Sequence, residues 1–431
     1  MSVNFLICLS VIFGLAAIGA PVALSMIVGA VVYLLVDGRD LSLAAESMIQ
    51  GMYNSFIVLA VPLFIFAANV MNAGTISDRL MNFCVAIVGR FRGGLAYVNI
   101  VTSLIFSGMS GSALADAAGI GKITTEMMIK DGRYPRGFSA ALTAATAVIG
   151  PIIPPSIPMV MYALVSDTSI GYLFLGGVGP GLLITLVLSV HSFVLARSKN
   201  FPVEPPVPMR LIPGVVLDAF PTLMMPVVLL GGIYGGAVTP TEAAAIAALY
   251  ALLLATFFYR AISLGNLYSV LLESARSSAS IGLVIGAALV LNYIVASENI
   301  PITIAKSIDG IDFSALGFLI LINIFVLFLG CFLDASTIIL VIVPLFIPTC
   351  KMLGIDLVHF GVLIVVNTMI GLITPPYGML LFVIDKTVGI TVAETTQAIL
   401  PFVIMLMLAL LTMTLLPEIV LWLPRQFGYK N

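Results

Sequence analysis

A series of apolar runs, each about as long as a membrane-spanning helix, extends along the chain from Phe5 to Trp422. In lipid, backbone N–H and C=O groups find no water, and an α-helix pairs them within one segment. The chain has 431 residues, of which 61% are hydrophobic and 9% are charged. A soluble domain has about a quarter of its residues charged, so this chain cannot coat a globule of its size with polar groups. The sequence predicts an all-α polytopic membrane protein embedded in the lipid bilayer.

Several functions fit this composition poorly. The net charge is −2 and no basic tract is present, so nucleic acid is not a predicted partner. The four cysteines lie singly, with neither a metal-binding spacing nor a disulfide framework. No Walker sequence indicates ATP binding. An intramembrane enzyme is the alternative class, but His191 and His359 lie far in sequence from any Ser-Gly motif, and no enzymatic activity is predicted.

Motifs in the first half recur in the second half at a spacing of about 221 residues. The segment Ile149–Pro155 (IGPIIPP) resembles Ile370–Pro376 (IGLITPP), and Arg39–Leu43 resembles Arg260–Leu264. Because these similarities follow in the same order, we infer that the chain contains two copies of one unit.

Each copy has the same predicted order of segments. The first copy covers 1–196, a polar, proline-rich cytoplasmic linker covers 197–213, and the second copy covers 214–431. Scaffold spans are expected at 1–73 and 214–297, and transport parts, each with a hairpin and a broken helix, at 93–177 and 313–397. In the ranges that follow, the first belongs to the first copy and the second to the second copy. Each copy begins with two spans (5–36 and 214–258), an amphipathic arm (40–53 and 260–275) and one span (55–73 and 277–297). A second arm (75–92 and 300–312), a bipartite apolar segment (93–129 and 313–350), and a broken span with a final span (137–196 and 357–422) complete it.

The bipartite segment 93–129 lies between two basic loops, 89–93 and 130–136. Under the positive-inside rule both loops are cytoplasmic, which two full spans or one re-entrant hairpin would satisfy. Its middle, Ser107–Asp116 (SGMSGSALAD), is small and polar, and irregular backbone is tolerated at membrane depth where it lines a cavity. We expect a re-entrant hairpin whose tip meets the substrate; the alternative is a periplasmic turn between full spans.

Counting the crossings from these loops places both termini in the periplasm and turns the second copy upside down. The predicted cytoplasmic segments hold 12 of the 18 Lys and Arg residues and the outer segments hold 5, which supports this topology. The predicted fold is an inverted repeat with two re-entrant helical hairpins and two broken helices. That layout is typical of a secondary transporter with a binding site at the membrane midplane.

The hairpin tips and the helix breaks are the candidate sites. A broken helix exposes carbonyl oxygens that can hold Na⁺, while the N-termini of half-helices present N–H groups to an anion. Each tip is expected to lie opposite the break of its own copy. The expected Na⁺ ligands are Ser107, Ser110, Gly150 and Pro154 in the first copy and Gly330, Asp334, Gly371 and Thr374 in the second. The expected substrate-binding residues are Ser110, Ser112, Asp116, Pro154, Pro155, Ser156, Pro375 and Pro376.

These features also have simpler interpretations. Pro-Pro can be merely a kink and Ser-Gly merely close helix packing, although two breaks at equivalent places favour function. Asp116 and Asp334 lie nearest the tips, and each could neutralise a cation or accept hydrogen bonds that brace the tip. No Lys or Arg falls firmly at mid-depth, so an anionic substrate would depend on amides, hydroxyls and bound cations. The 20 methionines are expected to face lipid or fill the core.

The runs Gly108–Ala113, Ile149–Pro158 and Gly371–Gly378 resemble the large membrane subunit of the tripartite ATP-independent periplasmic (TRAP) transporters, and the likeness covers essentially the whole chain. The sialic-acid branch is preferred to the C4-dicarboxylate branch, although no residue distinguishes the two. The resemblance implies Na⁺-driven uptake of an organic acid across the bacterial inner membrane by an elevator motion. A stand-alone Na⁺/carboxylate symporter is the alternative.

The resemblance also implies two protein partners. One is a soluble periplasmic substrate-binding protein, and the other is a small four-helix membrane subunit, which is expected to be a separate polypeptide. Na⁺ is the implied co-transported ion, with no organic cofactor. In the second tip, where hydroxyl groups are fewer, the carbonyl of Cys331 is the implied Na⁺ ligand.

Overall fold

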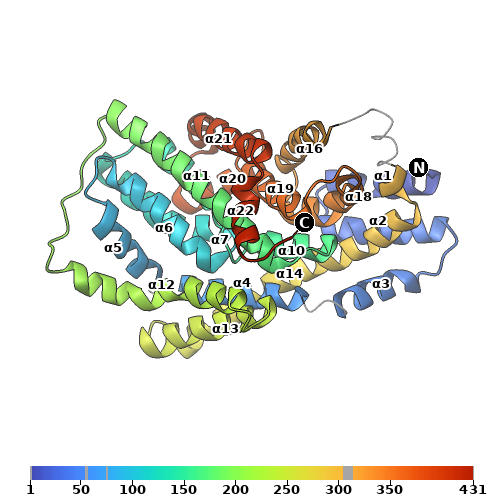
Figure 1. The fold of residues 1–431 in the computed structure, drawn as a ribbon, viewed down its shortest axis with the longest axis horizontal. Helices are drawn as coiled ribbons and strands as arrows, with labels where there is room; N and C mark the ends of the chain where they lie inside the picture. The colour runs from blue at the N-terminus through green and yellow to red at the C-terminus, as the bar shows by residue number, and fades with distance from the viewer. Residues whose placement is uncertain (1, 54–56, 74–75, 304–313, 431) are drawn as a thin grey trace.

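The computed structural model describes residues 2–53, 57–73, 76–303 and 314–430, and it is helical throughout (Figure 1). Within these ranges, an isolated bridge between Arg92 and Val203 is the only β-type pairing. Five of the described helices are long and apolar enough to cross a membrane, and a sixth crossing results if a bent pair is taken as one span. The chain is therefore an all-helical, multi-span membrane protein.

The first copy contains both a hairpin and a broken helix. Its helices are α1 (Val3–Ala17), α2 (Val22–Val36), α3 (Ser42–Tyr53), α4 (Ile57–Ala73), α5 (Ile76–Val88), α6 (Gly94–Ser110), α7 (Ala113–Ala118), α8 (Ile120–Ile129), the 3₁₀ turn η1 (Lys130–Gly132), α9 (Arg136–Ala147), α10 (Ile157–Ser166) and α11 (Ile170–Ser198). The limbs of the hairpin, α6 and α8, pack against each other, and α9 and α10 are the halves of the broken helix.

The second copy follows a similar order of elements, with one continuous helix in place of α3 and α4. Its helices are α12 (Ile212–Tyr234), α13 (Pro240–Leu253) with the π-helical turn η2 (Leu254–Phe258), α14 (Leu264–Ser297), α16 (Ala315–Gly330), α17 (Ala335–Thr337), η3 (Ile338–Ile342), η4 (Val343–Leu345), α18 (Ile347–Met352), α19 (Leu357–Gly371), α20 (Met379–Val388), α21 (Val392–Leu415) and α22 (Glu418–Gln426). The second hairpin closes where Phe318 and Phe325 of α16 pack on Phe346, with ring centroids 6.2 and 6.1 Å apart.

Helices of the two copies pack on each other in exchanged pairs. Helix α2 packs on α14, and its counterpart α13 packs on α4. Likewise, α11 packs on α19 while its counterpart α21 packs on α9. A two-fold axis produces such pairs, because every contact between the copies then occurs twice. Exchanged pairs of this kind are what two copies of one unit related by a two-fold axis would produce.

The structure departs from the predicted segments in the scaffold. A separate arm and span are predicted at 260–275 and 277–297, but α14 is one continuous helix of 34 residues. Residues 266–281 contain neither Gly nor Pro, so nothing in this backbone ends the helix there. In the first copy, the corresponding α3 and α4 are separate helices with a bend of 68° between them.

Two further parts of the chain differ from the expected layout, and a third lies mostly outside the described residues. Helices α1 and α2 have 15 residues each, about 22 Å, which is shorter than a bilayer core of about 30 Å. The predicted arm 300–312 falls mostly outside the described residues. The final span ends at Leu415, and a short helix that the sequence did not predict, α22, follows Pro417.

Side-chain contacts join the two halves of the chain at two places. At the first, Glu298 after α14 accepts hydrogen bonds from the hydroxyls of Ser2 (2.6 Å) and Tyr33 (2.7 Å) of the first copy. At the second, Arg79 of α5 forms a 2.5 Å ion pair with Asp218 of α12. In Figure 1, α12 and α13 of the scaffold lie along one edge and α16 and α21 along the opposite edge, with α10 between them. The site described next lies in this interior.

Candidate functional site

The tip of the first hairpin lies against the break between α9 and α10. Gly111 at the turn has a φ of 62°, and a Cβ there would stand 2.5 Å from the carbonyl oxygen of Pro155. Only glycine combines this conformation with so close an approach. Within the described part of the chain, the carbonyl oxygens of Pro154 and Pro155 accept no hydrogen bond. Tip and break therefore meet around unpaired backbone oxygens.

Asp116 of α7 lies behind this tip and is 1% exposed. The hydroxyl of Ser110 donates a short hydrogen bond to its Oδ1, whereas its Oδ2 has no partner among the described residues. That free oxygen faces the break, because a Cβ added to Gly150 would overlap with it. A buried carboxylate is costly unless it is paired, so this oxygen could serve as a cation ligand.

The tip of the second hairpin meets its own break through backbone alone. A Cβ on Gly371 would stand 2.7 Å from the Cα and carbonyl carbon of Gly330, so α16 and α19 touch without side chains between them. Close approach of this kind leaves carbonyl groups of both segments near one another. The Pro375–Pro376 peptide bond in this break is cis, as is the Pro154–Pro155 bond in the first break.

Asp334 and Thr374 have local partners in the second copy. Asp334 caps α17, since it accepts hydrogen bonds from the amide (3.1 Å) and the hydroxyl (2.5 Å) of Thr337. The hydroxyl of Thr374 donates to the carbonyl of Ile370 at 2.7 Å. Both residues are half-buried, and Pro376 beside them is exposed. The Asp334 carboxylate therefore braces its tip and also remains accessible.

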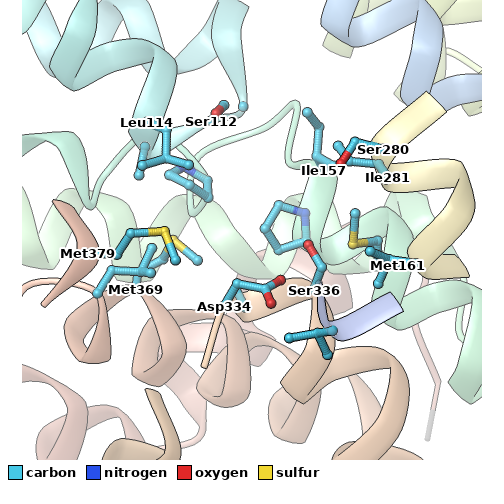
Figure 2. A pocket seen from close by; sticks show the side chains of 18 of the residues that line it. Ser112, Leu114, Ile157, Met161, Ser280, Ile281, Asp334, Ser336, Met369 and Met379 are labelled. Atoms are coloured by element: carbon cyan, nitrogen blue, oxygen red, sulfur yellow. The ribbon is translucent and has the colours of Figure 1, made fainter. Parts of the chain in front are cut away.

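A cavity of about 450 Å³ lies where both tips meet the scaffold (Figure 2). Ser112 reaches it from the first hairpin, and Asp334 and Ser336 reach it from the opposite side, from the second hairpin. The scaffold closes it with the start of α2, residues 21–23, and with residues 280–284 of α14. A ligand in this cavity would touch both hairpins and both copies of the scaffold.

Most of the predicted site residues lie behind the cavity wall. Of the predicted residues, Ser112 and Asp334 are the two that line the cavity among the described residues. The buried ones are Ser107, Ser110, Asp116, Gly150, Pro154, Pro155, Ser156, Gly330, Cys331 and Gly371, while Thr374, Pro375 and Pro376 lie in the more open second break. Ser156 caps α10, accepting from the amide of Met159 at 3.2 Å. The thiol of Cys331 donates back to the carbonyl of Leu327 at 3.3 Å.

Sequence reasoning missed most of the residues that wall the cavity. Met161, Met369 and Met379 line it, although the methionines were expected to face lipid or fill the core. Met369 and Met379 flank the second break in sequence, and that proximity was an available signal. Ser280 of α14 also lines the cavity but carries no such signal, because only the packing of α14 against the hairpins brings it there.

Comparisons with known proteins agree on one family. The family model described as "Tripartite ATP-independent periplasmic transporter, DctM component" matches residues 9–419. The chain is 40% identical over 418 residues to the sialic acid TRAP transporter large permease protein SiaM of Vibrio cholerae serotype O1. The matched region covers 96% of this chain and 97% of that protein. It is 39% identical over 373 residues to the C4-dicarboxylate TRAP transporter large permease protein DctM of Pseudomonas aeruginosa. This match covers 86% of this chain and 87% of that protein.

A solved structure shares the fold at low sequence identity. The YdaH transporter of Alcanivorax borkumensis superposes with a TM-score of 0.62 over 88% of each chain, with 14% of the residues identical. At that identity the likeness concerns the fold alone.

Proposed function

Because this chain belongs to the family of DctM components of tripartite ATP-independent periplasmic (TRAP) transporters, we propose that it imports an organic acid together with Na⁺ across the bacterial inner membrane. It is a transporter permease and not an enzyme. The observation that carries the proposal is the cavity of about 450 Å³. This cavity borders both hairpin tips and both copies of the scaffold, where a carrier with alternating access needs its substrate.

In the proposed motion, the transport parts (93–177 and 313–397) slide as one body against the scaffold. Hydrogen bonds join hairpin to broken helix within each part: Asn99 donates to Thr143 at 2.7 Å in a buried position, and Asn367 donates to Asn323 at 2.9 Å in a partly buried one. The proposed scaffold parts are joined at one end, where Ser2 and Tyr33 donate hydrogen bonds to Glu298 directly after α14. Two bodies with strong internal contacts and a cavity at their boundary suit an elevator mechanism.

We place Na⁺ at the two contacts between tip and break. Unwound backbone carbonyls are the usual Na⁺ ligands in broken-helix transporters. The unpaired carbonyl of Pro154 and the free Oδ2 of Asp116 support the first site. The proposed ligands are Ser107, Ser110, Gly150 and Pro154 for one ion, and Gly330, Cys331, Asp334, Gly371 and Thr374 for the other. The predicted substrate residues behind the wall would then act by shaping the tips.

The proposed partners are a periplasmic substrate-binding protein and a small four-helix membrane subunit. The test is reconstitution into proteoliposomes with candidate partners, followed by uptake of labelled organic acids under an inward Na⁺ gradient. We expect uptake that needs both the Na⁺ gradient and the binding protein. Unchanged uptake when K⁺ replaces Na⁺ would refute the coupling. Uptake of free acid by this chain alone would favour a stand-alone symporter.

The proposed topology places both termini in the periplasm. It depends on the bias of Lys and Arg residues described above. A single cysteine introduced at Ser2 or Lys430 should react with a membrane-impermeant thiol reagent in intact cells. Labelling only after permeabilisation would overturn this orientation.

A further inference from the structure

The charge in the cavity limits the charge of its ligand. Among the described residues that line it, Asp334 is the one ionisable side chain, and Lys, Arg and His are absent. One carboxylate of a substrate could be met by hydroxyls, by N–H groups and by the co-bound Na⁺. A second carboxylate would find no cationic side chain among these lining residues. Desolvating an unpaired charge is strongly unfavourable, so a dianion fits this cavity poorly.

The walls of the cavity are mainly apolar. Figure 2 shows Leu114, Met369 and Met379 on one side, and Ile157 and Met161 on the other. All five belong to the transport parts, so they would stay with the substrate during a sliding motion. Methionine side chains are flexible and adapt to irregular apolar ligands. The part of the cavity wall that belongs to the transport parts therefore suits an apolar ligand group.

Free hydroxyl groups in the cavity are few. Ser280 and Ser336 take part in no hydrogen bond within the described part of the chain, and the hydroxyl of Ser112 accepts from the amide of Ala115 at 3.4 Å but keeps its own hydrogen to donate. Three hydroxyl donors can serve one carboxylate. A polyhydroxylated acid would leave most of its own hydroxyl groups against methionine, leucine and isoleucine, without partners.

We propose that the substrate of this cavity is a monocarboxylate with an apolar body, rather than a dicarboxylate or a sugar acid. This inference rests on the proposed function, since it refines the acid that the same cavity would hold. The carboxylate would lie between the hairpin tips, near Ser336 and the co-bound cation. The apolar body would lie between Leu114 and Met379 on one wall and Met161 on the other. Neither relative named above decides the matter, because their named acids differ at almost equal identity.

The test compares three acids on the full-length chain in lipid nanodiscs with Na⁺ present. The probes are 4-methyl-2-oxopentanoate, 2-oxoglutarate, which has the same oxo-acid head but a second carboxylate, and sialic acid. The readout is the concentration of each acid that gives half of the maximal thermal stabilisation. We expect the apolar acid to need a concentration at least about tenfold lower than either of the others, because apolar contacts in such a pocket discriminate by about that factor or more.

Two variants connect this preference to the cavity. Leu114→Gln, at a position 40% exposed, should raise the half-saturating concentration of the apolar acid about tenfold. Leu316→Gln is the matched control, because Leu316 is 42% exposed on the other hairpin and does not line the cavity. Met379→Lys supplies the missing cation. In this variant, the half-saturating concentration of 2-oxoglutarate should be equal to or lower than that of the apolar acid. Retained stabilisation by Na⁺ in each variant shows that the protein is folded.

The outcomes separate the two proposals. If sialic acid or 2-oxoglutarate stabilises the wild type best, and Leu114→Gln changes that response, the cavity is the substrate site but the apolar monocarboxylate is overturned. The apolar monocarboxylate is overturned as well if Met379→Lys leaves the order of the acids unchanged. If no acid stabilises the chain, or if the response is equal in Leu114→Gln and Leu316→Gln, the cavity itself fails as the substrate site.

Discussion

Both halves of the chain contain a hairpin tip and a helix break, but the surroundings of these elements differ. In the first copy, Ser107, Ser110 and Asp116 are at most 1% exposed, and the break behind them is buried almost throughout. In the second copy, Asp334 is half-buried and Tyr377 in the break is 47% exposed. One duplicated motif thus gives a closed contact in one place and an accessible one in the other. A shared motif therefore fixes local geometry, whereas its neighbours determine what it can bind.

The largest effect is expected where the closed contact loses its one side-chain hydrogen bond. Ser110→Ala leaves the buried Asp116 carboxyl with no side-chain partner among the described residues. An unsatisfied buried group costs about 1–3 kcal/mol, and more when it is charged, so we expect a loss of about 3 kcal/mol. Thermal unfolding of the purified chain measures this loss.

The matched change in the second copy should cost much less. Thr337→Val removes the hydroxyl that bonds to Asp334, but the backbone amide of the same residue still caps the carboxylate at 3.1 Å. Asp334 is also accessible to water, so we expect a loss of at most about 1 kcal/mol. Equal losses for the two variants would show that the burial difference between the copies has no energetic consequence.

Substitutions of the glycines at the two contacts between tip and break should cause intermediate losses of stability. Here the larger loss is expected in the second copy. Gly371→Ala forces a methyl group onto the backbone of Gly330, which cannot move without shifting a helix. Overpacking costs about 1–3 kcal/mol, so we expect about 2 kcal/mol for this change. Gly150→Ala meets mainly the carboxylate end of the Asp116 side chain, with the carbonyl oxygen of Ala147 farther away at 3.3 Å, and a smaller loss is expected. A larger loss for Gly150→Ala, measured by thermal unfolding, would contradict this interpretation of the two contacts.

A substitution at the accessible break of the second copy should change the response to Na⁺ more than it changes the stability without Na⁺. If Thr374 is a Na⁺ ligand, Thr374→Ala should raise the Na⁺ concentration for half-maximal transport about tenfold. At saturating Na⁺ it should remove about 1.4 kcal/mol of Na⁺-dependent stabilisation. Melting temperature measured against Na⁺ concentration gives both values. A variant with the wild-type response to Na⁺ would remove Thr374 from the proposed site.

The smallest effect is expected for the melting temperature at low pH, through the carboxylates of Asp37 and Glu298. Hydrogen bonds from Ser2 and Tyr33 hold the pKa of Glu298 below its usual value, and those from Asn4 and Arg39 lower the pKa of Asp37. A lowered carboxyl pKa adds stability that is present above the unfolded-state value, about 4, and is lost as the pH falls through the folded-state value. We expect a constant melting temperature from pH 7 to about 5 and a small decrease below about 4. Glu298→Gln should weaken that decrease, and an unchanged pH profile would exclude this contact.

The sequence predicted the helical class and both helix breaks, because each depends on short-range chemistry. Ile149–Pro155 and Ile370–Pro376 combine glycine with two adjacent prolines, which together remove backbone donors and crowd the preceding turn, so the helix is interrupted there. The continuous helix α14 was not predicted, because a serine-rich stretch resembles a boundary although it contains no residue that breaks a helix. The cavity walls at Met161 and Ser280 were not predicted, since no local pattern places these residues opposite the tips.

Taken alone, the sequence determined that this chain is a helical membrane protein with several spans, and it predicted where two of its helices break. These follow from backbone hydrogen bonding in lipid and from the covalent limits of proline, which act within a few residues. Tertiary packing was needed to establish that Asp116 is enclosed while Asp334 faces a cavity, and that apolar side chains wall that cavity. Burial and charge at a site are sums over neighbours far apart in the chain, so equivalent positions in a duplicated sequence can have different environments.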